Sequence, residues 1–207
     1  MAVEIERRFL VNGDGWQQHV LWGQALRQGY LVASPAGLTL RVRIQQPIAD
    51  SGGTPESRSR ASGPDGSDPG QASQPPEALL TLKAPAPGAT AGAALSRLEY
   101  EYAIPASDAM ELFNLAEVAL SKRRFGLDLP GGHWVLDVFE NENAPLLIAE
   151  VELADASQTV ELPAWCGQEV SHRQDLSNAA LARRPLARWS AAERRELLGE
   201  PGLGRRP

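Results

Sequence analysis

The stretch EIERR (residues 4–8) decides the fold, because it alternates as a β-strand does while its repeating face is charged. Side chains two residues apart in a strand point to the same face of a sheet. Glu4, Glu6 and Arg8 therefore share one face, and Ile5 points to the other. The stretch predicts a strand with one charged and one apolar side.

The same alternation recurs along the chain. The further stretches are LTLRVR (38–43), LLTLK (79–83), RLEYEYAI (97–104), SKRRF (121–125), WVLDVF (134–139) and LIAEVEL (147–153). Together with the first stretch, their charged faces carry seven bases (Arg8, Arg41, Arg43, Lys83, Arg97, Lys122 and Arg124) and seven acids (Glu4, Glu6, Glu99, Glu101, Asp137, Glu150 and Glu152). The repetition predicts that these side chains line one common surface.

Two arrangements explain a charged surface of this kind. A solvated sheet face with cross-strand ion pairs is the usual explanation for alternating charges. The uniformly apolar opposite face favours a sheet that curls with its charged side inward. A dry interior would make so many charges prohibitive. A water-filled tunnel avoids this cost if its acids bind a metal ion and its bases bind a polyanion.

Composition limits the possible classes of protein. The chain has 207 residues, of which 43% are hydrophobic, so it can bury one real core. A net charge of −6 argues against a general nucleic-acid binder. No apolar run is long enough to cross a membrane. Cys166 is the single cysteine and cannot form an internal disulfide, so a reducing cytoplasm is the expected location.

The pattern of apolar and turn residues predicts eight strands, enough for a small closed barrel. They span residues 2–11, 27–32, 38–45, 78–83, 97–104, 121–129, 133–140 and 146–153. Helices are expected at residues 16–26, 108–120, 178–184 and 190–198, with Ser107 as the N-cap of the second.

Residues 46–77 differ sharply in composition from the rest of the chain. They are rich in Gly, Ser and Pro and have no large apolar residue after Ile48. Such a segment cannot bury enough surface to offset its ordering entropy, which predicts a disordered hairpin insertion. A domain boundary is the alternative, but strands with the same charged face stand on both sides. We therefore expect one domain over residues 1–190 and a frayed tail at residues 199–207.

The acids on the charged face occur in pairs at i, i+2. Glu4 with Glu6, and Glu150 with Glu152, offer the hard oxygen ligands that suit Mg²⁺ or Mn²⁺. A third pair, at residues 99 and 101, either binds a second metal or orients the bases. The bases together suit a chain of phosphates. The chain has no phosphate loop of the GxxxxGK[ST] kind, and its three scattered histidines give no zinc spacing.

These residues resemble the CYTH family, the triphosphate tunnel metalloenzymes. The opening signature of the family, ExExK, is similar to EIERR (4–8). The resemblance continues through RQGYL (27–31), RVR (41–43), TLK (81–83), RLEYEYAIP (97–105), SKRRF (121–125), WVLDVF (134–139), AEVEL (149–153) and WCGQEVSHRQDLSNAALA (165–182). It thus covers the chain apart from residues 46–77 and about the last twenty.

The resemblance implies a mainly β, α+β fold, namely an eight-stranded antiparallel tunnel barrel with helices packed outside and a C-terminal plug helix. It also implies a divalent metal and a triphosphate substrate. Carried over by position, the metal ligands are Glu4, Glu6 and Glu152, with Glu150 beside them, and the phosphate-binding residues are Arg41, Arg43, Lys83, Lys122 and Arg124. Arg8 and Arg97 complete the expected substrate-binding set.

Two positions depart from the family pattern. Arg8 replaces the signature lysine, which keeps the charge and loses a titratable amine. Asp175-Leu176 stands where members commonly carry Arg-Tyr, so the expected plug helix would contact substrate differently.

We expect metal-dependent hydrolysis of inorganic tripolyphosphate or of a small organic triphosphate. The expected catalytic residues are Lys83, Glu99, Glu101 and Asp137. The alternatives are a class IV-type adenylate cyclase and a non-catalytic polyphosphate or nucleotide sensor. The expected partner is the small-molecule triphosphate, with no nucleic acid and no membrane, and the oligomeric state stays open.

Overall fold

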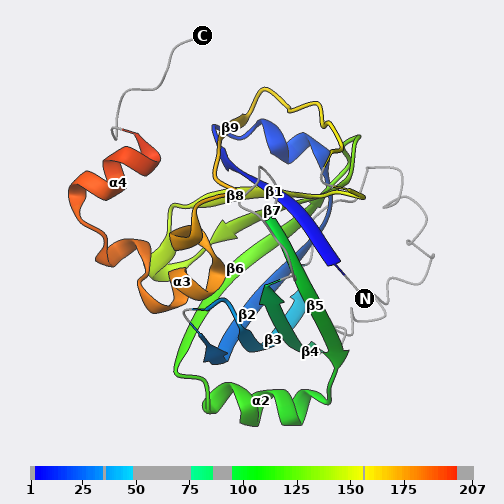
Figure 1. Ribbon diagram of the computed structural model, residues 1–207, viewed down its shortest axis with the longest axis vertical. Coiled ribbons are helices and arrows are strands. Elements are labelled where there is room, and N and C mark those ends of the chain that lie inside the picture. Colours follow the sequence, from blue (N-terminus) through cyan, green and yellow to red (C-terminus); the bar gives the residue numbers. More distant parts are fainter. Residues whose placement is uncertain (1–2, 35, 49–75, 86–94, 156, 200–207) are drawn as a thin grey trace, which may run out of the picture.

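The computed structural model describes residues 3–34, 36–48, 76–85, 95–155 and 157–199. In these ranges the chain forms nine β-strands and three α-helices (Figure 1). The strands are β1 (Val3–Val11), β2 (Val20–Ala33), β3 (Thr39–Pro47), β4 (Glu77–Pro85), β5 (Leu95–Ala103), β6 (Val118–Leu127), β7 (His133–Phe139), β8 (Leu147–Glu152) and β9 (Cys166–Glu169). The helices are α2 (Ala106–Asn114), α3 (Asn178–Arg183) and α4 (Ala191–Leu198), and the 3₁₀ turns are η1 (Gly15–His19), η2 (Asn141–Asn143), η3 (Gln174–Leu176) and η4 (Leu186–Arg188).

Strands β1 to β8 form a closed antiparallel barrel. Their hydrogen-bonded order is β5-β4-β3-β2-β6-β7-β8-β1, and pairing of β1 with β5 closes the ring. The ninth strand, β9, adds to the end of β1 beyond the closure. The predicted eight-stranded antiparallel barrel is confirmed, whereas β9 was not expected from the sequence.

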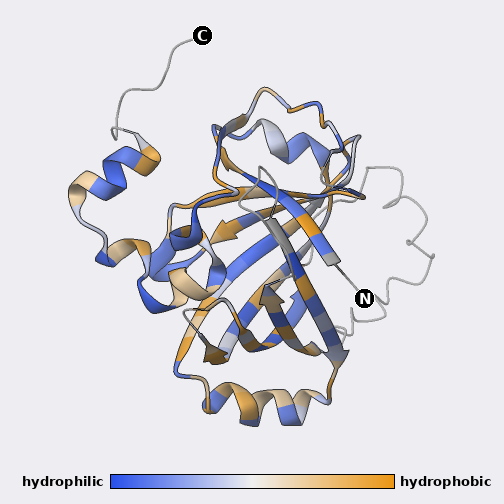
Figure 2. Cartoon of the chain, in the orientation of Figure 1, coloured by the Kyte–Doolittle hydropathy of each residue, from blue (hydrophilic) through white to orange (hydrophobic). Residues whose placement is uncertain are grey.

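Hydrophilic and hydrophobic residues alternate along the barrel strands, as the sequence predicts (Figure 2). On the outside, Phe9 of β1 packs against Trp134 of β7, with ring centroids 6.3 Å apart, and Trp165 contacts Trp134 edge-on at 6.4 Å. These aromatic side chains belong to a buried hydrophobic cluster on the outer wall. The hydrophobic core of this wall therefore lies outside the barrel.

The inner face of the barrel changes from charged to apolar along its length. Arg8 of β1 pairs with Glu150 of β8, and the next inward pair is Leu10 with Ile148. The apolar end of the inner face consists of Leu10, Leu120, Phe139 and Ile148, which belong to one buried cluster. Charged side chains therefore occupy only one end of the inner surface.

The helix expected at residues 16–26 is wrong. Residues Gly15–His19 form the short η1 turn, and β2 begins at Val20 and runs for 14 residues. Leu21, an apolar residue within the expected helix, is 53% exposed. Because β2 pairs with β3 on one side and β6 on the other along most of its length, strand pairing overrides the local helical pattern.

The helix expected at residues 108–120 is shorter and begins earlier. Helix α2 spans Ala106–Asn114, its N-cap is Pro105, and no side chain in the described ranges caps it. Ser107 instead donates to Asp108. The chain leaves the helix because Val118 pairs with Tyr30 as β6 begins. The two C-terminal helices, α3 and α4, lie where the sequence predicts them.

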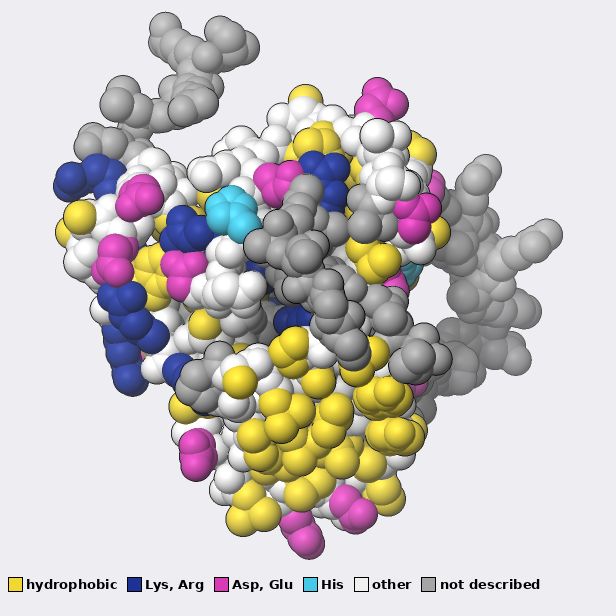
Figure 3. All heavy atoms as spheres, in the orientation of Figure 1, with side chains coloured by type: hydrophobic (Ala, Val, Ile, Leu, Met, Phe, Trp, Pro, Cys, Tyr) yellow, Lys and Arg dark blue, Asp and Glu magenta, His cyan; other side chains and the backbone are white. Residues whose placement is uncertain are grey.

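Helix α2 covers part of the outer face of β3 and β4, where Ala109 packs against Val42 and Ala78. Around this helix hydrophobic side chains gather on the visible face (Figure 3). The exposed ones in this part of the chain include Leu82, Tyr100, Tyr102, Met110 and Leu115. The apolar outer surface is thus covered only in part.

Two of the expected segments lie outside the described residues. They are most of the insertion predicted at residues 46–77, of which 49–75 are not described, and residues 200–207 of the predicted tail. No helix in the described part of the chain has the length and apolar character needed to span a membrane.

Candidate active site

The charged end of the barrel encloses a cavity of about 900 Å³. All fourteen charged residues predicted to share one surface line this cavity, except Lys122 and Asp137. The lining members are Glu4, Glu6, Arg8, Arg41, Arg43, Lys83, Arg97, Glu99, Glu101, Arg124, Glu150 and Glu152. The structure therefore brings most of the predicted site residues to one space.

Acids and bases alternate around the wall formed by β1, β4 and β5. The Nζ atom of Lys83 lies 2.7 Å from Glu4 and 2.9 Å from Glu99. Arg97 lies 2.9 Å from Glu6 and 3.8 Å from Glu4. Burial alone would raise the pKa of Glu4, but the charges of Lys83 and Arg97 lower it to about 2. Glu4 is therefore ionised over the whole physiological pH range.

The wall formed by β3, β4 and β5 holds a second group of paired charges. Arg43 lies 3.4 Å from Glu101, which also accepts a hydrogen bond of 2.8 Å from Thr81. Arg41 lies 3.6 Å from Glu99. Burial and the neighbouring Arg41 lower the pKa of Arg43 to about 10. Among the residues that the structure describes, the buried Nε atoms of Arg41 and Arg43 have no hydrogen-bond partner, so this wall has unused donors, as an anion-binding surface requires.

Carboxylates crowd the wall between β1 and β8. Glu6 is directly opposite Glu152 in the strand register, and like charges in that position destabilise a sheet. Burial, followed by the charges of Glu150 and Glu4, raises the pKa of Glu6 to about 7. A cation would relieve this repulsion, and four carboxylates are the donor type that Mg²⁺ and Mn²⁺ prefer. The chemistry of the donor set therefore fits a divalent metal.

The carboxylates do not form a ready coordination sphere. Within the described ranges, no three acidic, histidine or cysteine side chains are grouped closely enough to hold a metal ion. Glu4, Glu6 and Glu150 instead contact Lys83, Arg97 and Arg124, respectively. Metal binding at these carboxylates would therefore compete with existing ion pairs.

Lys122 and Asp137, which were predicted to bind substrate and to take part in catalysis respectively, are not among the residues that line the cavity. Both side chains are 0% exposed, and the Lys122 ammonium donates to Asp137. Arg124 binds both oxygens of Asp137 at 2.7 Å and reaches Glu150 at 2.6 Å. Although burial opposes it, the charges of Arg124 and Lys122 lower the pKa of Asp137. Asp137 therefore fixes the orientation of Arg124, whose other side faces the cavity.

Arg8 lines the cavity, but its guanidinium group points to backbone oxygens. It is 4% exposed and donates to the carbonyls of Ser171, Arg173 and Leu176 at 3.2–3.3 Å. Its Nε atom lies 3.9 Å from Glu6. Arg8 thus differs from the other cavity arginines, whose named partners are side chains.

Several cavity-lining residues escaped the sequence prediction, namely Tyr30, Thr39, His133, Ser171, His172, Gln174, Ser177, Asn178 and Arg183. Tyr30 is buried beside Arg41 and donates to Gln28, and burial raises its pKa. Gln28 and Tyr30 share a face of β2 within the strand expected at residues 27–32, but neither side chain is charged, so a search for alternating charges passed over both. The C-terminal residues of the set come from turns and α3, which carry no such periodic signal.

The family model of the CYTH domain matches residues 2–184 of the chain. The chain belongs to the CYTH domain family. The family resemblance inferred from the sequence motifs is thereby confirmed.

Two relatives of the chain bear the same functional name. The inorganic triphosphatase of Acetivibrio thermocellus is 30% identical over 187 residues, which are 89% of this chain and 96% of the relative. The inorganic triphosphatase of Nitrosomonas europaea is 32% identical over 183 residues, which are 86% of this chain and 96% of the relative. A crystal structure of the inorganic triphosphatase NE1496 superposes with a TM-score of 0.50 at 30% identity and covers 88% of this chain and 95% of its own.

Proposed function

We propose that this CYTH protein hydrolyses a phosphoanhydride bond of inorganic tripolyphosphate or of a small organic triphosphate. The observation that carries the proposal is the enclosed cavity of about 900 Å³, whose wall presents bases and acids in alternation. The relatives named inorganic triphosphatase support the same substrate class. A triphosphate needs cationic groups along its length and a metal ion to neutralise the rest of its charge.

Five bases remain to bind phosphate oxygens in this proposal: Arg41, Arg43, Lys83, Arg97 and Arg124. Arginine binds phosphate through two donors, whereas lysine provides a compact charge. Because Asp137 fixes Arg124 through both of its oxygens, this arginine can present donors without losing further side-chain entropy on binding.

Glu4, Glu6, Glu150 and Glu152 would hold the divalent ion, Mg²⁺ or Mn²⁺. When bound, the ion neutralises phosphate oxygens and draws electron density from the phosphorus. The repulsion between carboxylates that helps to raise the pKa of Glu6 supports this assignment, because a bound cation would neutralise that repulsion. The two glutamates of β5, at residues 99 and 101, contact bases rather than other carboxylates, which favours a role in orienting the bases.

In the proposed reaction a water oxygen bonds to the terminal phosphorus as the bond to the bridging oxygen breaks. The products are orthophosphate and the shortened phosphate chain. Glu99 or Glu101 accepts the proton of the attacking water, and Lys83 donates a proton to the leaving oxygen. Lys83 is suited to this step because its Nζ contacts Glu4 and Glu99 at the cavity wall. Asp137 has no direct part, since it is fully buried.

The decisive experiment is a phosphate-release screen with tripolyphosphate, ATP, GTP and thiamine triphosphate, each with Mg²⁺ and with Mn²⁺. We expect metal-dependent release of orthophosphate, with tripolyphosphate among the best substrates. Cyclic AMP and pyrophosphate from ATP would identify a cyclase instead. Tight binding without turnover of any of the four would identify a sensor and overturn the proposal.

A further inference from the structure

The C-terminal segment, residues 171–183, closes the apolar end of the barrel. Its Leu176 and Leu181 are 1% and 0% exposed and share a hydrophobic cluster with Leu10 and Ile148 of the inner face. Polar residues of the same segment line the cavity, namely Ser171, His172, Gln174, Ser177, Asn178 and Arg183. The segment therefore fills one end of the barrel with leucines and presents polar groups toward the charged end.

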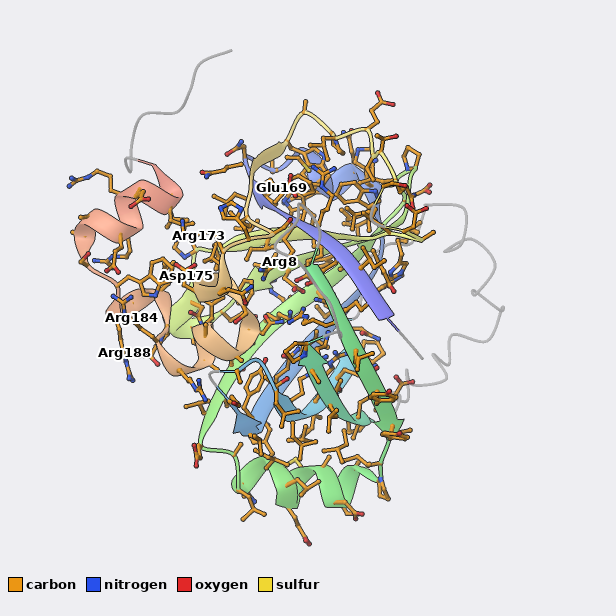
Figure 4. The ribbon with its side chains drawn as sticks, viewed as in Figure 1. Arg8, Glu169, Arg173, Asp175, Arg184 and Arg188 are labelled. Carbon is orange, nitrogen blue, oxygen red and sulfur yellow. The ribbon has the colours of Figure 1, made fainter. Side chains whose placement is uncertain are left out.

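Two cationic side chains form hydrogen bonds with this segment where the apolar end of the barrel meets the charged end. Arg8 donates from Nη1 to the carbonyl of Leu176, and from Nη2 to the carbonyls of Ser171 and Arg173. Figure 4 shows Arg8 on β1 beside the part of the segment that carries Arg173 and Asp175. The backbone joins the same contact, because the amide of Arg8 donates to the Ser171 hydroxyl at 3.0 Å.

Lys122 is the second cation. Besides Asp137, it donates to Oδ1 of Asn178, the first residue of α3, at 3.2 Å. Its ammonium group is fully buried, so a phosphate chain in the cavity cannot reach it without movement of the segment. Ser177 caps α3 by accepting from the amide of Ala180, which fixes the turn that presents Asn178 to Lys122.

We infer that Arg8 and Lys122 are positioning residues that hold the C-terminal segment in place, rather than residues that bind phosphate. Carbonyl oxygens are acceptors only, so each bond from Arg8 occupies a donor that a phosphate would need. The two departures of this chain from the family pattern also meet here: Arg8 contacts the carbonyl of Leu176, beside Asp175. The inference rests on these contacts and does not require the proposed hydrolysis.

The test measures amide hydrogen exchange of the full-length protein without ligands, compared between wild type, Arg8→Met and Arg43→Met. Arg43 is the matched control, because it lines the same cavity but pairs with Glu101 and not with the segment. We expect Arg8→Met to speed exchange in residues 171–183 by at least about tenfold, because three hydrogen bonds are lost together. Exchange in β6 and β7 should stay unchanged in Arg8→Met, and exchange in the segment should stay unchanged in Arg43→Met.

A second variant, Arg8→Lys, keeps the charge but lacks the fork that reaches three carbonyls. We expect amide exchange in residues 171–183 to be as fast in Arg8→Lys as in Arg8→Met. Tripolyphosphate affinity, measured by calorimetry, should fall further in Arg43→Met than in Arg8→Lys. Wild-type exchange in Arg8→Met or Arg8→Lys, together with a loss of tripolyphosphate binding as large as that of Arg43→Met, would overturn the inference. This result would identify Arg8 as a phosphate ligand and would leave the proposed hydrolysis intact. If Arg8→Met fails to fold, the Arg8→Lys comparison decides the question alone.

Discussion

The buried pair of Lys122 and Asp137 gives the sharpest test of how the barrel tolerates interior charge. Asp137→Asn keeps the volume of the side chain and removes its charge, so no cavity confuses the result. Arg124 retains the carboxylate of Glu150 at 2.6 Å, whereas Lys122 retains the neutral amide of Asn178 at 3.2 Å and the ring of Phe139. Lys122 is therefore the cation that the substitution leaves without a carboxylate partner.

The magnitude follows from the protonation of Lys122. Burial, together with the charge of Arg124, lowers its pKa from 10.5 to about 8, even with Asp137 present. Without Asp137 the pKa falls further, and the folded protein can release the proton instead of burying an unpaired charge. The extra loss of stability is then limited to about 1.4 kcal/mol for each pH unit below 8. It approaches about 4 kcal/mol at pH 5, is about 1.4 kcal/mol at pH 7 and disappears above pH 8.

The sign of this pH dependence is fixed by linkage. Because the pKa of Lys122 is lower in the folded state, the unfolded chain binds more protons between about pH 8 and pH 10.5, and wild-type stability rises with pH in that window. Because the pKa of Lys122 is lower still in Asp137→Asn, the stability of this variant rises with pH already below pH 8, where that of wild type does not. Urea unfolding followed by tryptophan fluorescence at pH 5, 6, 7 and 8 measures the difference between the two proteins.

The control is Glu140→Gln, which removes a carboxylate from an exposed pair with Arg123 at 3.2 Å. We expect the unfolding free energy of Glu140→Gln to lie within about 1 kcal/mol of the wild-type value at every pH, as for other surface pairs. A deficit for Asp137→Asn that is equal at pH 5 and pH 8 would refute the reasoning. It would mean that lost hydrogen bonds, and not the charge of Lys122, account for the destabilisation.

The remaining predictions concern the cavity. Glu6→Gln should weaken Mn²⁺ binding and abolish turnover without lowering the unfolding free energy, because it removes one of several crowded carboxylates; wild-type Mn²⁺ affinity by calorimetry would contradict the metal assignment. Lys83→Arg should bind tripolyphosphate as wild type does but lower kcat by at least about tenfold, since guanidinium does not titrate; equal kcat would exclude proton transfer by Lys83. Mn²⁺ and tripolyphosphate should strengthen each other's binding, because a metal at Glu4 frees Lys83 for phosphate; independent affinities in paired titrations would show that this ion pair persists when both ligands bind.

The sequence predicts the barrel well where one strand carries charge on one face and apolar residues on the other. EIERR (4–8) and LIAEVEL (147–153) are such stretches, and they become neighbouring strands with Glu6 opposite Glu152. The period of two is a local property, so a single stretch reveals it. Closure of the barrel depends on β1 pairing with β5, some ninety residues away, and the antiparallel tunnel arrangement was implied by the family resemblance rather than by periodicity.

Residues 16–26 show where local pattern fails. Apolar residues at Val20, Leu21 and Leu26 fit a helical face, but the backbone groups of β2 are satisfied by two partner strands. That pairing involves β3 and β6, and no local window contains either one. Tyr30 lies in the part of β2 that was expected as a strand, and it escaped the site prediction because its side chain is not charged.

The alternation also identifies the face of a side chain without its depth along the barrel. Lys122 and Arg124 share one face of β6, yet Arg124 lines the cavity and Lys122 is sealed beneath Asn178. The difference arises because residues 171–183 return to the barrel and cover one end of it. The sequence of that segment has no periodic pattern from which its position could be predicted. Where the segment covers the inner face, a charge must be paired with protein groups. Beyond the segment, the same residue type is free to meet a ligand, so the boundary near Arg8 separates charges that stabilise the fold from charges available for chemistry.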